Sequence, residues 1–150
     1  MSSFLGKYYN TLDPKGRIII PAPFREILSS AKNTKLIIAN DAFDHCLCAY
    51  PVEEWGNLVG RVKDKPQTMD SVKYFMRRVV GSAVECELDK QGRIQIPSAL
   101  RVDAGLSSEV VVMGQGNKIE IWEKNALEVV ADPTKIDKNA FKKELSDLGI

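Results

Sequence analysis

The chain contains an internal repeat that constrains its fold more than any other feature. Residues 12–25 recur as residues 88–101, at an offset of 76 positions, and eight of the fourteen paired residues are identical. The two segments read Leu-Asp-Pro-Lys-Gly-Arg-Ile-Ile-Ile-Pro-Ala-Pro-Phe-Arg and Leu-Asp-Lys-Gln-Gly-Arg-Ile-Gln-Ile-Pro-Ser-Ala-Leu-Arg. Solenoids need at least about three repeats, so this pattern predicts one duplicated module instead.

The two copies also match in pattern downstream of the identical residues. Short apolar segments at 35–39 and 46–50 in the first copy correspond to 109–113 and 118–122 in the second. Such segments are typical of strands, and each copy then reaches a helical stretch. One module is too small to bury much apolar surface, so we expect the two to pack as a pseudo-symmetric pair. The predicted division is a first module at 4–64, a connecting helix at 65–82, a second module at 83–131 and a C-terminal helix or tail at 132–150.

Each copy predicts a hairpin that is closed by a tight turn. In the first copy, Asp13 and Gly16 occupy the first and fourth positions of a type I turn, with proline and lysine between them. Asp89 and Gly92 take the same positions in the second copy. A proline ends each returning strand, because proline cannot donate to a central ladder. Ser98, after the second proline, is predicted to cap a short helix.

Two further helices are predicted outside the repeat. Apolar residues recur at helical spacing over 67–81, which indicates an amphipathic helix between the copies. The segment 132–150 is charged, with Phe141, Leu145 and Leu148 spaced along one helical face. It is expected either to dock as a helix or to fray.

Charge is distributed unevenly along a chain whose net charge is only +1. Residues 1–25 and 61–78 are basic, whereas residues 26–60 and 102–150 are acidic. Such segregation can create a basic face on a protein that is nearly neutral overall, although runs of this kind are often only solvated helix faces. No apolar run approaches the roughly 20 residues that span a bilayer, and no signal-peptide core is present. We therefore predict a cytoplasmic protein without a membrane partner.

The sequence offers little for catalysis or for metal binding. The cysteines Cys46, Cys48 and Cys86 are odd in number and are interpreted as small buried residues. His45 is the only histidine, so a zinc site lacks ligands, and we interpret its surroundings as a polar loop between strands. No nucleophile elbow, P-loop or dinucleotide fingerprint is present. We expect no enzyme activity, no catalytic residues, no metal, no cofactor and no small-molecule substrate.

The turns instead provide arginines that are suited to recognising nucleic acid. An aspartate at the first turn position can accept hydrogen bonds from the turn backbone, and its carboxylate can orient an arginine four residues later. A guanidinium held in this way suits bidentate recognition of phosphate or guanine. The aspartates are therefore interpreted as structural, while the residues alone fit either a structural role or a contact with DNA for Arg17 and Lys15. Arg93 offers the same geometry in the second copy, with Gln91 near the tip.

At these two turns the sequence resembles the MraZ family, whose members carry paired Asp-x-x-x-Arg motifs. The matching segments are 13–17 and 89–93, their Ile-x-Ile-Pro continuations, and the stretches 50–55 and 120–122. The resemblance covers roughly residues 4–131. It implies an α+β fold in which two pseudo-symmetric AbrB-like swapped-hairpin β-modules pack as one small barrel, with peripheral helices.

The resemblance also implies a function. MraZ proteins form ring-shaped homo-oligomers, among which we favour an octamer. They bind repeats in promoter DNA of the bacterial division and cell-wall gene cluster, and are expected in the cytoplasm at the nucleoid. The family's main DNA-binding arginine corresponds to Arg17. Members usually open Met-Phe-x-Gly, whereas this chain opens with two additional residues and has Leu5 where a basic residue often stands. A phosphate contact from that position could shift to Lys7.

An AbrB-like antitoxin or protein-interaction module is the main alternative. Related hairpin folds bind DNA and also neutralise a toxin, usually through a disordered tail. The segment 132–150 is short and partly helical, which gives this alternative little support. The first copy is basic and the second is neutral overall, so we expect the first turn to read DNA and the second chiefly to complete the fold.

Overall fold

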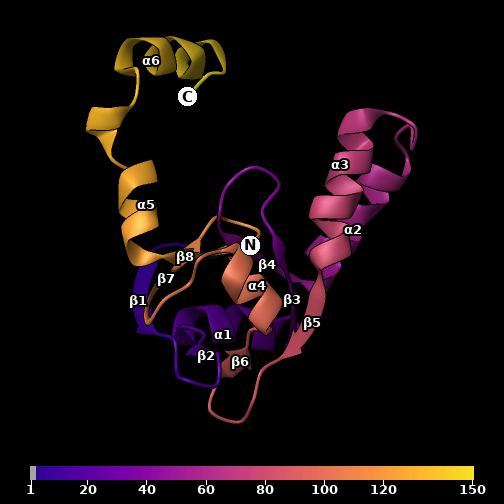
Figure 1. Cartoon of the computed structure of the whole chain (residues 1–150), viewed down its shortest axis with the longest axis vertical. Helices are drawn as coiled ribbons and strands as arrows, with labels where there is room; N and C mark the ends of the chain where they lie inside the picture. The colour runs from indigo at the N-terminus through magenta and orange to yellow at the C-terminus, as the bar shows by residue number, and fades with distance from the viewer. Residues whose placement is uncertain (1–2) are drawn as a thin grey trace.

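The computed structural model describes residues 3–150 and shows an α+β protein built on antiparallel strands (Figure 1). Of the two additional residues near the start, Ser2 lies outside the described residues and Ser3 lies within them. The strands are β1 (Lys7–Thr11), β2 (Arg17–Ile19), β3 (Lys35–Asn40), β4 (Leu47–Pro51), β5 (Val84–Glu87), β6 (Arg93–Gln95), β7 (Glu109–Gly114) and β8 (Ile119–Glu123). The α-helices are α1 (Ala22–Ser30), α2 (Val52–Lys63), α3 (Asp70–Arg78), α4 (Ser98–Asp103), α5 (Lys124–Val130) and α6 (Lys138–Asp147).

Six of the strands form one antiparallel sheet in the order β1-β7-β8-β4-β3-β5, so that the pair β7 and β8 of the second copy lies between β1 and β4 of the first. The remaining two, β2 and β6, pair with each other. Their register places Ile18 opposite its repeat equivalent, Ile94. The local symmetry between the copies therefore runs through this residue pair.

The single small barrel that the resemblance implied is not found in the described residues. The large sheet is open, with β1 and β5 as its edges. The strands β2 and β6 are only three residues long, because Pro21 and Pro97 follow shortly after and stop the ladder. They pair with each other across the symmetry centre and do not extend the large sheet.

The sheet buries apolar side chains on both faces. Along β8, Ile119 and Ile121 enter the main core, whereas Trp122 packs on the opposite face. This alternation follows from the two-residue period of a strand. The main core also contains Ile18 and Ile94, while α5 covers part of the opposite face through Leu127.

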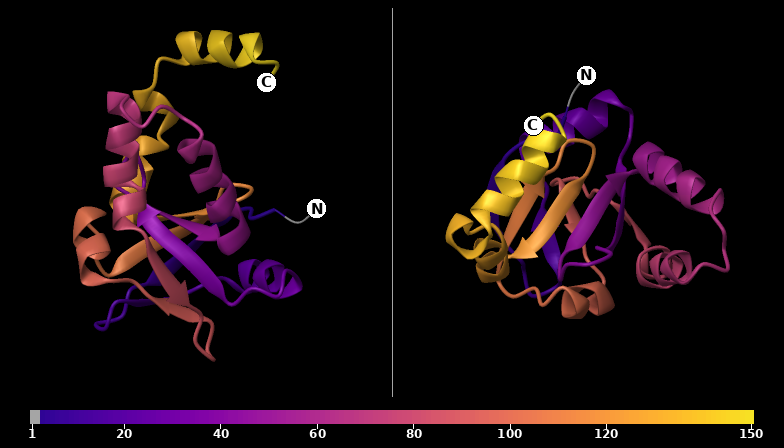
Figure 2. Two further views of the ribbon diagram at one scale, coloured as in Figure 1. Left: turned by 90° about the vertical axis from the view of Figure 1, so that its right-hand side faces the viewer. Right: turned by 90° about the horizontal axis from the view of Figure 1, so that it is seen from above.

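Helices α2 and α3 project beyond the sheet as two separate arms, and α6 stands apart at the same end of the molecule (Figures 1 and 2). None of these three described helices contains a fully buried residue. The C-terminal segment 132–150 contains the helix α6. Asp137 caps this helix by accepting a hydrogen bond from the backbone amide of Ala140 at 3.0 Å.

Two local predictions are corrected by the structure. The helix expected over 67–81 is shorter, because α3 ends at Arg78 and a 3-10 turn follows at Val80–Ser82, where Gly81 is a weak helix former. Ser98 does not cap α4: Pro97 occupies the cap position and no side chain bonds the free amides there. Among the described residues, no helix combines the length and the apolar character that crossing a membrane requires.

Candidate nucleic-acid interface

The first turn is organised by the carboxylate of Asp13. One oxygen, Oδ1, accepts hydrogen bonds from the backbone N–H groups of Lys15 and Arg17, both at 2.9 Å. The other oxygen, Oδ2, accepts from Nε of Arg17 at 2.6 Å. A backbone hydrogen bond of 2.9 Å from the amide of Gly16 to the carbonyl of Asp13 closes the turn. Gly16 has a φ of 79°, a conformation that residues with a side chain rarely adopt.

The second turn repeats this geometry with the corresponding residues. Asp89 accepts from the backbone of Gln91 and of Arg93 at 2.9 Å each, and from Nε of Arg93 at 2.8 Å. Gly92 also has a φ of 79°. In both turns the aspartate thus accepts hydrogen bonds from the turn backbone and from the arginine four residues later.

The hydrogen bonds of the turns stabilise the charged form of the aspartates. The backbone amide and the guanidinium of Arg17 hold the pKa of Asp13 below its ordinary value, although partial desolvation opposes the shift. The backbone and side chain of Arg93 lower the pKa of Asp89 in the same way. Each carboxylate is therefore ionised near neutral pH, and each arginine is held by a full negative charge.

The outer nitrogens of both arginines make no hydrogen bond within the described residues. Within residues 3–150, the guanidinium of Arg17 forms a hydrogen bond only through Nε, and so does that of Arg93. Their side chains are 30% and 26% exposed. A guanidinium that is fixed at Nε and accessible at its two outer nitrogens can donate two parallel hydrogen bonds to phosphate or guanine.

Each turn is supported by residues of the other copy. The carbonyl of Gly16 accepts from the amide of Ile96 at 2.8 Å, and the carbonyl of Gly92 accepts from the amide of Ile20 at 2.9 Å. In addition, the side-chain amide of Gln95 donates to the carbonyl of Lys15 at 2.9 Å. The two hairpins are thus interlocked through β2 and β6.

Two further arginines, Arg25 and Arg101, lie directly over the turn glycines and were not among the predicted site residues. A Cβ on Gly16 would lie 1.6 Å from Nη1 of Arg101, and one on Gly92 would lie 2.5 Å from Cδ of Arg25. Both arginines occupy the last identical position of the repeat, which is the sequence signal that could have revealed them. Each belongs to the copy opposite the turn that it covers.

The two turns project from the same end of the molecule, opposite α6 (Figure 2). Lys15 is exposed at the first turn, and Lys90 is exposed at the second. Lys7 is not at this tip. It pairs with Met113 at the far end of β1 from the turn. The structure therefore brings Arg17, Arg93 and Lys15 to one end and leaves Lys7 apart from them.

These features define a duplicated α+β protein that presents two oriented arginines at one end. A sequence model of the family described as "MraZ protein, putative antitoxin-like" matches residues 3–77 and 79–144, so that each matched segment spans one copy of the turn. The chain belongs to the MraZ family.

Curated relatives cover nearly all of the chain. It is 38% identical over 146 residues to a protein of Thermoanaerobacter sp. (strain X514), with 97% of this chain and 99% of the relative covered. It is 40% identical over 147 residues to one of Halothermothrix orenii, with 98% and 99% covered. A protein of Desulfitobacterium hafniense is 42% identical over 121 residues, 81% of each chain. All three are named transcriptional regulator MraZ, which is a non-enzymatic role and agrees with the prediction that the chain is not an enzyme.

Proposed function

We propose that this protein is a transcriptional regulator that binds double-stranded promoter DNA through its hairpin turns. The observation that carries the proposal is the guanidinium of Arg17, which Asp13 fixes at Nε while its outer nitrogens make no hydrogen bond within residues 3–150 and its side chain is 30% exposed. The names of the relatives support the regulatory role. The proposed ligand is a set of repeats in the promoter of the division and cell-wall gene cluster, and the proposed location is the cytoplasm, at the nucleoid.

The first turn is proposed as the principal reader of DNA. It presents Lys15 beside Arg17, whereas the second turn presents Lys90 and Gln91 beside Arg93. Arg93 and Lys7 are proposed as secondary contacts. Lys7 could reach only a different part of the DNA, because it lies at the far end of β1.

A ring-shaped homo-oligomer, with an octamer favoured, is part of the same proposal. One chain presents only two turns, and a protein that contacts few phosphates binds DNA weakly at physiological salt. Several copies on one surface would raise the affinity through effective concentration. Exposed apolar residues on the projecting helices, such as Tyr74 of α3 and Phe141 of α6, support contacts between subunits. We also propose that the two copies are AbrB-like modules, since each turn is built with support from the other copy.

The test is DNA binding measured by fluorescence anisotropy, with the region upstream of the protein's own gene as the probe. Arg17→Ala should abolish specific binding, Arg93→Ala should weaken it less, and the oligomer measured by light scattering should be unchanged. Arg61→Ala is the matched control, because Arg61 is an exposed arginine in the basic run at α2, away from the turns. Full binding by Arg17→Ala would refute the site, and loss with Arg61→Ala would move it to the helices.

An antitoxin is the second candidate, and the words "antitoxin-like" in the family description favour it. In that case the exposed apolar side chains of α6, including Phe141 and Leu145, would contact a toxin. Co-expression with the neighbouring genes followed by purification tests this candidate. Recovery of a toxic partner that is lost on deletion of 132–150 would favour it over the regulator.

A further inference from the structure

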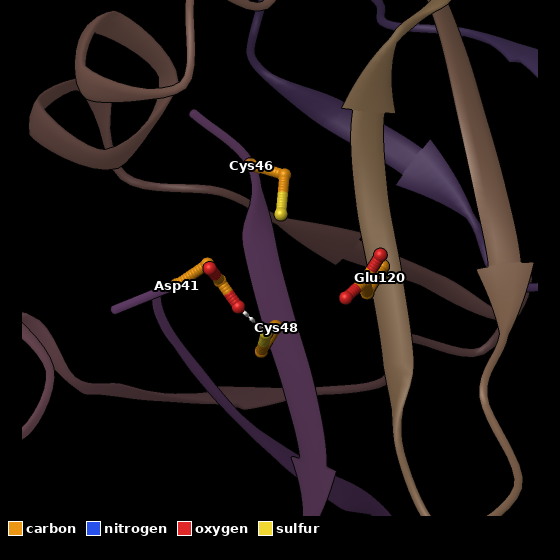
Figure 3. Close-up of side chains that lie close together, drawn as sticks. All are labelled: Asp41, Cys46, Cys48 and Glu120. Carbon is orange, nitrogen blue, oxygen red and sulfur yellow. Dashed lines mark hydrogen bonds between the residues drawn. The ribbon is translucent and has the colours of Figure 1, made fainter. Parts of the chain in front are cut away.

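The face of the sheet opposite the main core carries a cluster of four potential metal ligands, away from the turns. They are Asp41, Cys46, Cys48 and Glu120, and their ligand atoms all lie within 4.8 Å of one another (Figure 3). The sequence interpretation considered only the cysteines and His45. It missed both carboxylates, because these come from segments that are distant from each other in the chain.

Strand geometry fixes the four residues in place. Cys46 and Cys48 are two residues apart, so their side chains point to the same face. Glu120 lies directly opposite Cys48 in the register of β4 and β8. Asp41 follows β3, and its amide donates to the carbonyl of Cys46 at 3.0 Å. The cluster therefore rests on hydrogen-bonded backbone.

The burial of the four residues suits a bound cation. Cys46 and Cys48 are 0% and 1% exposed, whereas Asp41 and Glu120 are half-buried. The two thiols are thus buried, whereas the two carboxylates are partly exposed, so an ion would approach the thiols from the carboxylate side. His45 is exposed in the same loop and does not belong to the cluster.

Neighbouring groups orient the carboxylates without using all of their oxygens. Nε1 of Trp122 donates to Oε1 of Glu120 at 2.9 Å, and within residues 3–150 no group donates to Oε2. Asp41 is held at Oδ2 by the amides of Phe43 and Asp44, while Oδ1 lies 3.4 Å from the sulfur of Cys48. Supporting hydrogen bonds of this kind are characteristic of metal ligands in proteins.

We propose that this cluster is a structural zinc site, formed by two thiolates and two carboxylates. Zinc accepts sulfur and oxygen ligands together, whereas Mg²⁺ and Ca²⁺ prefer oxygen alone and Cu(I) prefers sulfur. Tetrahedral coordination at about 2.0 Å to oxygen and 2.3 Å to sulfur needs ligand atoms about 3.3 to 3.8 Å apart. Side-chain rotation can bring atoms that already lie within 4.8 Å to this separation.

The zinc ion would join the two copies of the module. Three ligands belong to the first copy, and Glu120 belongs to the second, across the β4–β8 pair. The loop that carries Asp41 and Cys46 also contacts α3, since Arg78 donates from Nε to the carbonyl of Asp41 at 3.1 Å. An ion here would therefore stabilise the junction of the copies and the base of the projecting helices.

The experiment titrates the full-length protein, reduced and treated with a chelator, with Zn²⁺, and uses Co²⁺ as a spectroscopic probe. One ion should bind per chain and raise the melting temperature. The Co²⁺ form should show thiolate-to-metal charge transfer and the visible bands of tetrahedral cobalt. Because bound thiols must lose their protons, zinc binding should also release protons to the buffer.

Substitution of single proposed ligands tests which side chains bind the ion. Cys48→Ser and Glu120→Gln should each weaken zinc binding by more than about tenfold. Cys86→Ser is the matched control and should bind normally, because Cys86 is a buried cysteine of β5 outside the cluster. If Cys48→Ser does not fold, Glu120→Gln decides, since glutamine keeps an oxygen that can accept from Trp122.

Three results would overturn the proposal. The first is Co²⁺ binding without thiolate charge transfer. The second is zinc affinity that is the same in Glu120→Gln as in the unchanged protein. The third is a disulfide between Cys46 and Cys48 in the protein purified from cells, which would leave no thiolates for a metal.

Discussion

Replacing Gly16 with alanine tests whether the interlocked turns stabilise the fold. The added Cβ meets two obstacles. The residue has a φ of 79°, and the Cβ would lie 1.6 Å from Nη1 and 2.5 Å from Cζ of Arg101. Because those atoms belong to the end of a flexible side chain, Arg101 can move away, but the backbone strain stays.

The two effects have separable magnitudes. A left-handed backbone conformation costs an alanine about 1–2 kcal/mol. Displacing the Arg101 side chain from its preferred rotamer adds about 0.5–1.5 kcal/mol. Gly16→Ala should therefore lower the free energy of unfolding by roughly 1.5–3.5 kcal/mol. In an Arg101→Ala background only the backbone part should remain, about 1–2 kcal/mol.

Thermal melts at one fixed protein concentration measure the effect, because the proposed oligomer would make Tm depend on concentration. A chain of this size loses about 2–4 °C in Tm per kcal/mol, so Gly16→Ala should melt roughly 3–14 °C lower. Gly60→Ala is the matched control: Gly60 lies in α2 with nothing within 4 Å of its Cβ position. That change should stabilise the protein by about 0.5–1 kcal/mol. The reasoning fails if both variants shift Tm in the same direction, or if Arg101→Ala leaves the cost of Gly16→Ala unchanged.

Three further predictions concern the core, acid stability and DNA binding. Ile18→Ala and Ile94→Ala should each lower the free energy of unfolding, measured in urea, by about 2–5 kcal/mol, because both side chains are only 1% exposed. A loss of stability for only one of the two variants would contradict the symmetry between the copies. The pKa values of Asp13 and Asp89 are lower in the folded protein than their ordinary value of 3.8, so the ionised carboxylates stabilise the fold. This contribution to the free energy of unfolding is complete above pH 3.8 and is lost as pH falls through the lower folded pKa. An Asp13→Asn/Asp89→Asn variant should consequently show a flatter stability profile in acid, and a profile parallel to that of the unchanged protein would argue against these shifts. Under the proposed function, Arg17→Ala should cost about 1–3 kcal/mol of binding free energy per engaged turn, measured by anisotropy at several salt concentrations.

The local geometry of the candidate site followed from its sequence. An aspartate, a glycine and an arginine at fixed spacing predict the turn and the orientation of Arg17, because all of these contacts lie within five residues. The covering positions of Arg25 and Arg101 did not follow from spacing. They depend on the pairing of β2 with β6, which joins residues 74 to 78 positions apart.

The sequence by itself determined that the chain is duplicated, where its turns lie and which arginine each turn holds. These properties arise from short-range backbone preferences and from hydrogen bonds between near neighbours. Only the tertiary structure decided that the sheet is open, that each turn is supported by the opposite copy, and that Asp41 and Glu120 join two cysteines. Strand order and register are set by which apolar faces can be buried together, and that choice depends on the whole chain at once.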